Sequence, residues 1–183
     1  MQIENWKKIK TPLSNDVIRE LRSGDGVLIN GTMFAARDKA HQRFAQMLDR
    51  GEKLPFDFNG QIIYYVGPSP TPPGFVSGSA GPTTSSRMDA LTEMVLAAGI
   101  KGMVGKGKRN EATREFITKY AAPYFSAFGG AGAYLAKCII KSEIIAFEDL
   151  GPEAVYKMEV LDFPAIVIND IYGGDLYTDV IRK

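Results

Sequence analysis

The feature that most constrains this fold is a regular alternation of short apolar runs and amphipathic segments. Residues 26–30 and 62–66 have the pattern of buried strands. Each is followed by apolar residues at helical spacing, in residues 36–48 and 88–98. Strands that alternate with helices in this way are typical of an α/β domain.

The alternation continues to the C-terminal part of the chain. A short strand is expected to end at Gly105, and the tail from Asp170 is expected to be polar and turn-like. Ser85 or Ser86 is expected to cap the helix of residues 88–98, and Gly99 to end it. The other expected elements are helices at 110–120 and 131–140 and strands at 123–128, 155–160 and 164–168.

Length and composition indicate a soluble chain with one core. The 183 residues are 45% hydrophobic and 23% charged, which suits one domain over residues 1–183. A net charge of +1 argues against nucleic acid or an anionic membrane as partner. The polar N-terminus lacks the pattern of a signal peptide, and no apolar run approaches the ~20 residues of a membrane helix. We therefore expect a cytoplasmic protein.

Residues 66–86 are rich in proline, glycine and serine. Such a stretch is either a linker between domains or a long ordered loop. The flanking segments, of roughly 65 and 100 residues, are short for separate domains. We therefore expect a loop that covers a functional site.

The segment Gly-Pro-Thr-Thr-Ser-Ser-Arg-Met-Asp, residues 81–89, has the pattern of an anion site. Backbone amides at a helix start attract a carboxylate, and the Arg87 guanidinium can bind it with two hydrogen bonds. A capped helix start is the alternative. However, four consecutive hydroxyl residues exceed what one cap needs, and Arg87 would lie where the helix dipole disfavours a cation.

Arg37 and Lys106 each follow an expected strand. In an open α/β sheet, residues beyond the carboxyl ends of strands line the ligand crevice. For Arg37 the alternative is a solvated surface arginine paired with Asp38. Lys106 lies between two glycines that would let the backbone approach a ligand closely. A nucleotide phosphate loop does not fit, because Gly107 stands where Ser or Thr is required.

Three other features have less specific interpretations. His41 is either a base or a partly buried residue that bonds Asp38. Cys138 is expected to be a small buried hydrophobe, and as the only cysteine it completes no cysteine-based metal or iron–sulfur site. The glycines of residues 129–132 indicate close helix–sheet packing more than a dinucleotide site.

Together, Arg-Asp-Lys-Ala-His at 37–41, the segment 81–89 and Gly-Lys-Gly at 105–107 resemble the β subunit of class I fumarases and L-tartrate dehydratases. The same unit forms the C-terminal domain of single-chain class I fumarases. Segments 129–131, 154–160 and 162–165 are also similar, so the resemblance covers roughly residues 24–173.

This resemblance implies a swivelling β/β/α fold and a hydro-lyase that interconverts fumarate and L-malate. It implies a [4Fe–4S] cluster held by cysteines of an α subunit, with no metal ligand on this chain. The expected assembly is therefore a hetero-oligomer that is active only with its partner. L-tartrate dehydratase and a non-catalytic anion-binding or regulatory domain are the alternatives.

The resemblance also implies roles for single residues. Arg37 and Arg87 match arginines that bind the substrate carboxylates, and Lys106 matches a lysine close to the substrate. Thr83 matches the threonine proposed to take the C3 proton. Because a threonine hydroxyl is a very weak acid, nearby cations or a proton acceptor from the partner would have to assist it.

Overall fold

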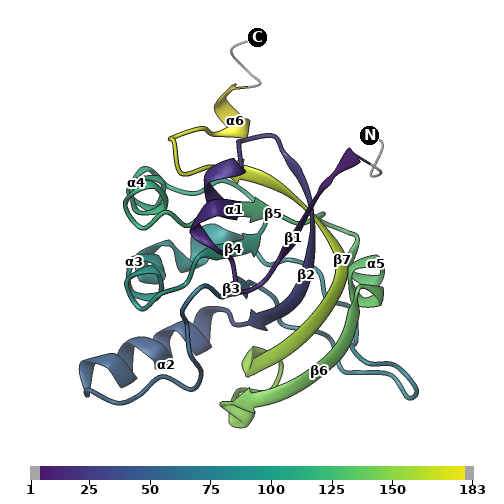
Figure 1. Ribbon diagram of the computed structural model, residues 1–183. Helices are drawn as coiled ribbons and strands as arrows, with labels where there is room; N and C mark the ends of the chain where they lie inside the picture. The colour runs from purple at the N-terminus through teal and green to yellow at the C-terminus, as the bar shows by residue number, and fades with distance from the viewer. Residues whose placement is uncertain (1–4, 180–183) are drawn as a thin grey trace.

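A computed structural model describes residues 5–179 of the chain (Figure 1). The strands are β1 (Lys7–Lys10), β2 (Gly26–Ala35), β3 (Ile62–Tyr64), β4 (Gly102–Gly105), β5 (Tyr124–Ser126), β6 (Ile139–Ala146) and β7 (Val155–Asn169). The helices are α1 (Asn15–Glu20), α2 (Asp38–Asp49), α3 (Asp89–Ala97), α4 (Glu111–Lys119), α5 (Gly132–Lys137) and α6 (Leu176–Asp179), with 3-10 helices η2 (Ser85–Met88) and η3 (Glu148–Glu153). The expected α/β class is confirmed.

The strands form one mixed sheet in the order β1-β2-β3-β4-β5-β7-β6. Strands β1 to β5 are parallel to their neighbours, whereas β7 is antiparallel to β2, β5 and β6. Because β7 pairs with both β2 and β5, the strands β2, β3, β4, β5 and β7 close into a small barrel. The sheet is therefore closed, unlike the open α/β sheets for which the strand-end rule applied to Arg37 and Lys106 was stated.

Both faces of the short parallel strands are buried, which explains their apolar sequences. Ile62 and Tyr64 pack into the cluster inside the barrel, and Ile63 packs into a second cluster that includes Phe44 of α2. Helices α2, α3 and α4 lie along one side of the strands, and α5, β6 and β7 lie on the other (Figure 1). Within residues 5–179, every helix falls short of the length and apolar character that a membrane span requires.

Most expected elements are present, with three differences. The expected strands at 155–160 and 164–168 form one strand, β7, in which Asp162 has a φ of 46°. The expected helix at 131–140 ends at Lys137, and β6 begins at Ile139. Strands β1 and β6 and helices α1 and α6 were not predicted, and α6 lies in the tail that was expected to be turn-like. Both of these strands lie at sheet edges and are largely exposed, so they lack the buried pattern.

The stretch between Tyr64 and Ser85 is a loop, as predicted, and not a linker. The flanking strands β3 and β4 pair with each other in the same sheet. The loop is held by a hydrogen bond from Ser69 N to Ser79 O at 3.0 Å and by one from the Tyr64 hydroxyl to Ala80 O. It therefore leaves the barrel at the end of β3 and returns to it before η2.

Candidate functional site

The carboxyl ends of β2, β3 and β4 bring the four predicted site residues to one end of the barrel. Arg37 follows β2, and Lys106 follows β4 directly. Thr83 lies beside the end of β3, because its backbone amide donates to Tyr65 O at 2.7 Å. Arg87 lies on η2, a few residues further along the chain.

Thr83 and Lys106 are held side by side by their backbones. Thr84 and Lys106 form a parallel bridge, in which Lys106 N donates to Thr83 O at 3.2 Å and Ser85 N donates to Lys106 O at 2.9 Å. The side chain of Lys106 is exposed. A hydroxyl group and an ammonium group therefore extend from two adjacent segments.

Arg37 and Arg87 converge on the carboxylate of Asp38, the first residue of α2. Nε of Arg37 lies 3.0 Å from Oδ2, and Nε of Arg87 lies 2.8 Å from Oδ1. Each guanidinium makes its closest approach through Nε, which leaves the Nη donors for a ligand. The alternative interpretation of Arg37 was a solvated surface arginine paired with Asp38. The pairing is present, but only 21% of the Arg37 side chain is exposed, so Arg37 is not freely solvated.

The environment of Asp38 favours its charged form. Partial burial alone would raise the pKa of this carboxyl. Hydrogen bonds from its own backbone amide and from Arg37, together with the charge of Arg87, lower the pKa below its usual value. Asp38 therefore stays ionised and offsets part of the charge of the two arginines.

The expected cap of the helix by Ser85 or Ser86 was wrong. Residues 85–88 form η2, and α3 begins at Asp89 with Met88 at the N-cap position. Ser85 is fully buried, and its hydroxyl lies 2.9 Å from the hydroxyl of Tyr124. Its hydroxyl therefore joins two parts of the chain instead of capping a helix.

His41 is completely buried, and its expected bond to Asp38 was wrong. Nδ1 lies 3.0 Å from the carbonyl oxygen of Arg37, whereas Nε2 has no hydrogen-bond partner within residues 5–179. Loss of solvation lowers the pKa of His41 to about 4. At neutral pH the ring is uncharged, and it supports the backbone of Arg37.

The glycines near the site accommodate other parts of the chain. A Cβ atom on Gly105 would lie 2.0 Å from Ser85 Oγ, so this glycine makes room for the Ser85 side chain. The expected close approach to a ligand is therefore not needed to explain Gly105. A Cβ atom on Gly132 would lie 2.4 Å from Ser79 Oγ and 2.9 Å from Gly81 N. The close packing predicted for residues 129–132 is thus present, but its partner is the loop and not the sheet.

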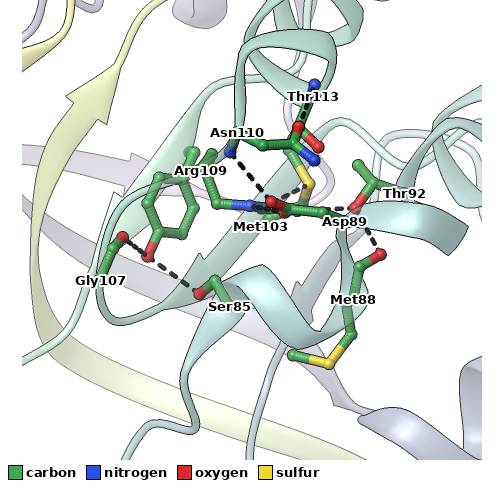
Figure 2. Close-up of polar contacts among 10 residues, drawn as sticks. Ser85, Met88, Asp89, Thr92, Met103, Gly107, Arg109, Asn110 and Thr113 are labelled. Atoms are coloured by element: carbon green, nitrogen blue, oxygen red, sulfur yellow. Dashed lines mark hydrogen bonds and ion pairs between the residues drawn. The ribbon is translucent and has the colours of Figure 1, made fainter.

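A buried ion pair that the sequence did not reveal lies under this site (Figure 2). Nε of Arg109 donates to Oδ1 of Asp89 at 2.6 Å, and Nη2 donates to Thr92 Oγ1 at 2.6 Å. The other oxygen of Asp89 accepts from Asn110 N at 2.9 Å. The pair connects two segments: the loop after β4, which contains Lys106, and helix α3, which follows Arg87. Asp89 belongs to the motif at 81–89, but no local pattern identifies Arg109 as its partner.

The described residues do not fit a metal or iron–sulfur centre. Among residues 5–179, no group of three or more His, Cys, Asp or Glu side chains could hold a metal ion. Cys138 is half-buried and packs against the barrel core, which agrees in part with the expected buried hydrophobe. Burial raises the pKa of its thiol, which therefore stays protonated at neutral pH.

The arrangement can bind a small anion. Two guanidiniums and an ammonium group lie at the same end of the barrel as the Thr83 hydroxyl. Guanidinium groups bind carboxylates through paired hydrogen bonds, and an ammonium group adds a point charge.

Comparisons with known proteins agree with the resemblance. The family profile described as "Fumarase C-terminus" matches residues 3–180. The chain is 40% identical over 179 residues to "Fumarate hydratase 2" of Leishmania major, covering 94% of this chain and 31% of that protein. It is 38% identical over 157 residues to "Fumarate hydratase class I, anaerobic" of Escherichia coli, covering 85% and 29% of the two chains.

A third relative has nearly the same length as the matched region. The chain is 38% identical over 177 residues to the "Putative L(+)-tartrate dehydratase subunit beta" of Methanocaldococcus jannaschii, covering 93% of this chain and 91% of that protein. By contrast, the chain spans less than a third of the length of each of the two fumarate hydratases. On the profile match and these identities, the chain belongs to the fumarase C-terminal family.

Proposed function

We propose that this chain is the β subunit of an iron–sulfur-dependent hydro-lyase that interconverts fumarate and L-malate. The observation that carries the proposal is the convergence of Arg37 and Arg87 on Asp38, at the same end of the barrel as the paired segments of Thr83 and Lys106. In this proposal the two arginines bind the substrate carboxylates, and Lys106 lies close to the substrate.

The site keeps a net positive charge, which suits a carboxylate ligand. Arg37, Arg87 and Lys106 supply three positive charges, against two negative charges from Asp38 and from Glu153, whose Oε2 lies 3.7 Å from Arg37 Nε. Abstraction of a carbon proton builds up further negative charge on the substrate. Fixed cations at this position would stabilise that charge in the transition state.

Thr83 is the candidate for proton transfer at C3. Its hydroxyl oxygen would accept this proton during dehydration of L-malate and return it during hydration of fumarate. Because an unassisted threonine hydroxyl is a poor base, the cations of the site and an acceptor on the partner chain would have to favour its ionised form.

The partner is proposed to be an α subunit that holds a [4Fe–4S] cluster. The described part of this chain offers no set of cluster ligands, and the relative in Methanocaldococcus jannaschii is named as a subunit beta. The name of that relative supports a hetero-oligomer. In this proposal the chain is one swivelling β/β/α domain over residues 1–183.

L-tartrate dehydratase is the second candidate function. The match to the relative in Methanocaldococcus jannaschii spans 91% of that protein and supports this alternative. A third candidate is an anion-binding domain without catalysis.

The test is an assay of the assembled pair. The chain would be co-expressed with the α-type protein from its own source, and the cluster reconstituted without oxygen. We expect reversible conversion of L-malate to fumarate, followed by fumarate absorbance, and little turnover of L-tartrate. Turnover of tartrate alone would favour the second candidate. A cluster-loaded complex that acts on none of the three acids would contradict the proposal.

A further inference from the structure

The hydroxyl of Tyr124, on β5, lies between the two segments that carry Thr83 and Lys106. It donates to the carbonyl oxygen of Gly107 at 2.9 Å and lies 2.9 Å from Ser85 Oγ. A phenol has one proton to donate, so Ser85 must donate its own proton to the phenol oxygen. The result is a directed chain of two hydrogen bonds from Ser85 through Tyr124 to Gly107, whose end residues face each other in Figure 2.

The two end residues of this hydrogen-bond series, Ser85 and Gly107, are close to the proposed site residues. Ser85 follows Thr83 by two positions, and Gly107 follows Lys106 directly. The backbone bridge between Thr84 and Lys106 joins the same two segments on the adjacent side. The Tyr124 hydroxyl therefore adds a side-chain link where the backbone bridge ends.

Tyr124 is itself a rigid anchor. Its ring is fully buried, and its backbone pairs with Met103 of β4 and Asn169 of β7 within the barrel. The Arg109 guanidinium lies 5.0 Å from the ring centre and is fixed by the Asp89 carboxylate. A side chain held on so many sides has little freedom to follow a movement of either segment.

We infer that Tyr124 is a positioning residue for the proposed active site. Through Ser85 and Gly107, its hydroxyl fixes the Thr83 hydroxyl relative to the Lys106 ammonium group, and it has no direct contact with the substrate. This inference rests on the proposed function. A small displacement of a proton-transfer group is costly, since a misplacement of about 1 Å lowers a rate by as much as about 10²-fold.

The test variant is Tyr124→Phe, which removes only the shared hydroxyl. In the assembled enzyme we expect kcat to fall about ten-fold or more, with KM within about two-fold, because Arg37 and Arg87 keep their contacts with Asp38. Ser85→Ala breaks one of the two bonds and should cause a smaller fall. Since both act through the same link, the double variant should be no slower than Tyr124→Phe alone.

The matched control is Tyr120→Phe, which removes a hydroxyl that bonds Glu93 in the helical layer. This variant should keep the kcat of the wild-type enzyme. If Tyr124→Phe does not fold, Ser85→Ala must show the selective fall in kcat by itself. Additive losses in the double variant, or a kcat within two-fold of wild type for Tyr124→Phe, would overturn the inference.

Hydrogen exchange of the assembled protein separates this inference from the proposed function. The Ser85 and Lys106 amides form the bridge between the two segments, and they should exchange faster in Tyr124→Phe but not in Tyr120→Phe. Unchanged exchange would overturn the positioning role whether or not the enzyme acts on dicarboxylates. If the wild-type complex is inactive but exchange is faster in Tyr124→Phe, the result would support the positioning role of Tyr124 and refute the proposed reaction.

Discussion

Nε of Arg87 lies 2.8 Å from Oδ1 of Asp38, although one residue precedes α3 and the other begins α2. The other carboxylate oxygen of Asp38 accepts from Arg37 at 3.0 Å. One carboxylate thus orients both guanidiniums before any ligand arrives. Such an arrangement lowers the entropic cost of fixing two long side chains on binding.

Asp38→Asn tests this orientation. The substitution removes a negative charge, which would favour a bound dianion by about 1 kcal/mol in a solvated site. It also removes the ion pair with Arg87 and the charged acceptor of the Arg37 hydrogen bond, a bond with a value of about 1.5–3 kcal/mol. The loss of orientation should therefore dominate, with KM for L-malate raised about ten-fold and kcat less affected. Asp149→Asn, which breaks an exposed pair with Arg43, is the control and should leave KM unchanged.

Thr83→Ala and Arg87→Ala test the site assignment itself. Each should lower kcat/KM of the assembled enzyme at least ~10²-fold, as does the loss of a donor that stabilises the transition state. Ser86→Ala removes an exposed hydroxyl from the same segment and should remain active. Steady-state assays with L-malate decide the matter, and wild-type rates in either test variant would refute the assignment.

His41 should make stability depend on pH. Its pKa is about 4 in the folded chain and about 6.5 when unfolded, so the unfolded state binds this proton more readily. The free energy of unfolding should therefore fall as the pH drops, by about 2 kcal/mol between pH 7 and pH 5. Urea unfolding at these two pH values measures the difference. In His41→Asn the difference should largely disappear, since Asp38 titrates below this range.

The Asp89–Arg109 pair should contribute strongly to stability. Arg109 has a fully buried side chain, so Asp89→Asn leaves a buried charge without its counter-ion. We expect a loss of about 3–5 kcal/mol in the free energy of unfolding, measured by urea denaturation. Glu93→Gln breaks an exposed pair with Lys119 and should not shift the unfolding midpoint measurably. Equal free energies of unfolding for the two variants would show that the buried Asp89–Arg109 pair does not stabilise the fold.

The sequence was sufficient to predict elements that are buried or amphipathic. The strands β3 and β4 are apolar on both faces, and α4 begins at Glu111, after Asn110, whose side chain caps the helix by accepting from Thr113 N at 2.8 Å. The closure of the barrel could not be predicted, because it depends on β7 pairing with two strands that are distant in the sequence. The left-handed backbone of Asp162, inside the continuous strand β7, could not be predicted from the sequence either.

The same distinction applies to the candidate site. Residues at strand ends could be selected from local order alone, and Arg37, Thr83, Arg87 and Lys106 do lie at one end of the barrel. The contacts of Arg87 with Asp38, of Ser85 with Tyr124 and of Asp89 with Arg109 depend on tertiary packing, which no local spacing encodes. The capping role expected of Ser85 failed for this reason, since a tyrosine on β5 competes for its hydroxyl.

The pairing of β7 with both β2 and β5 has a consequence for biosynthesis. Since β7 is the last strand in the described part of the chain, a ribosome releases β2 and β5 long before the strand that joins them. Until then each has an unpaired edge, and such edges promote association between nascent chains. We therefore expect synthesis of this protein to depend on chaperones that shield these edges until translation reaches Asn169.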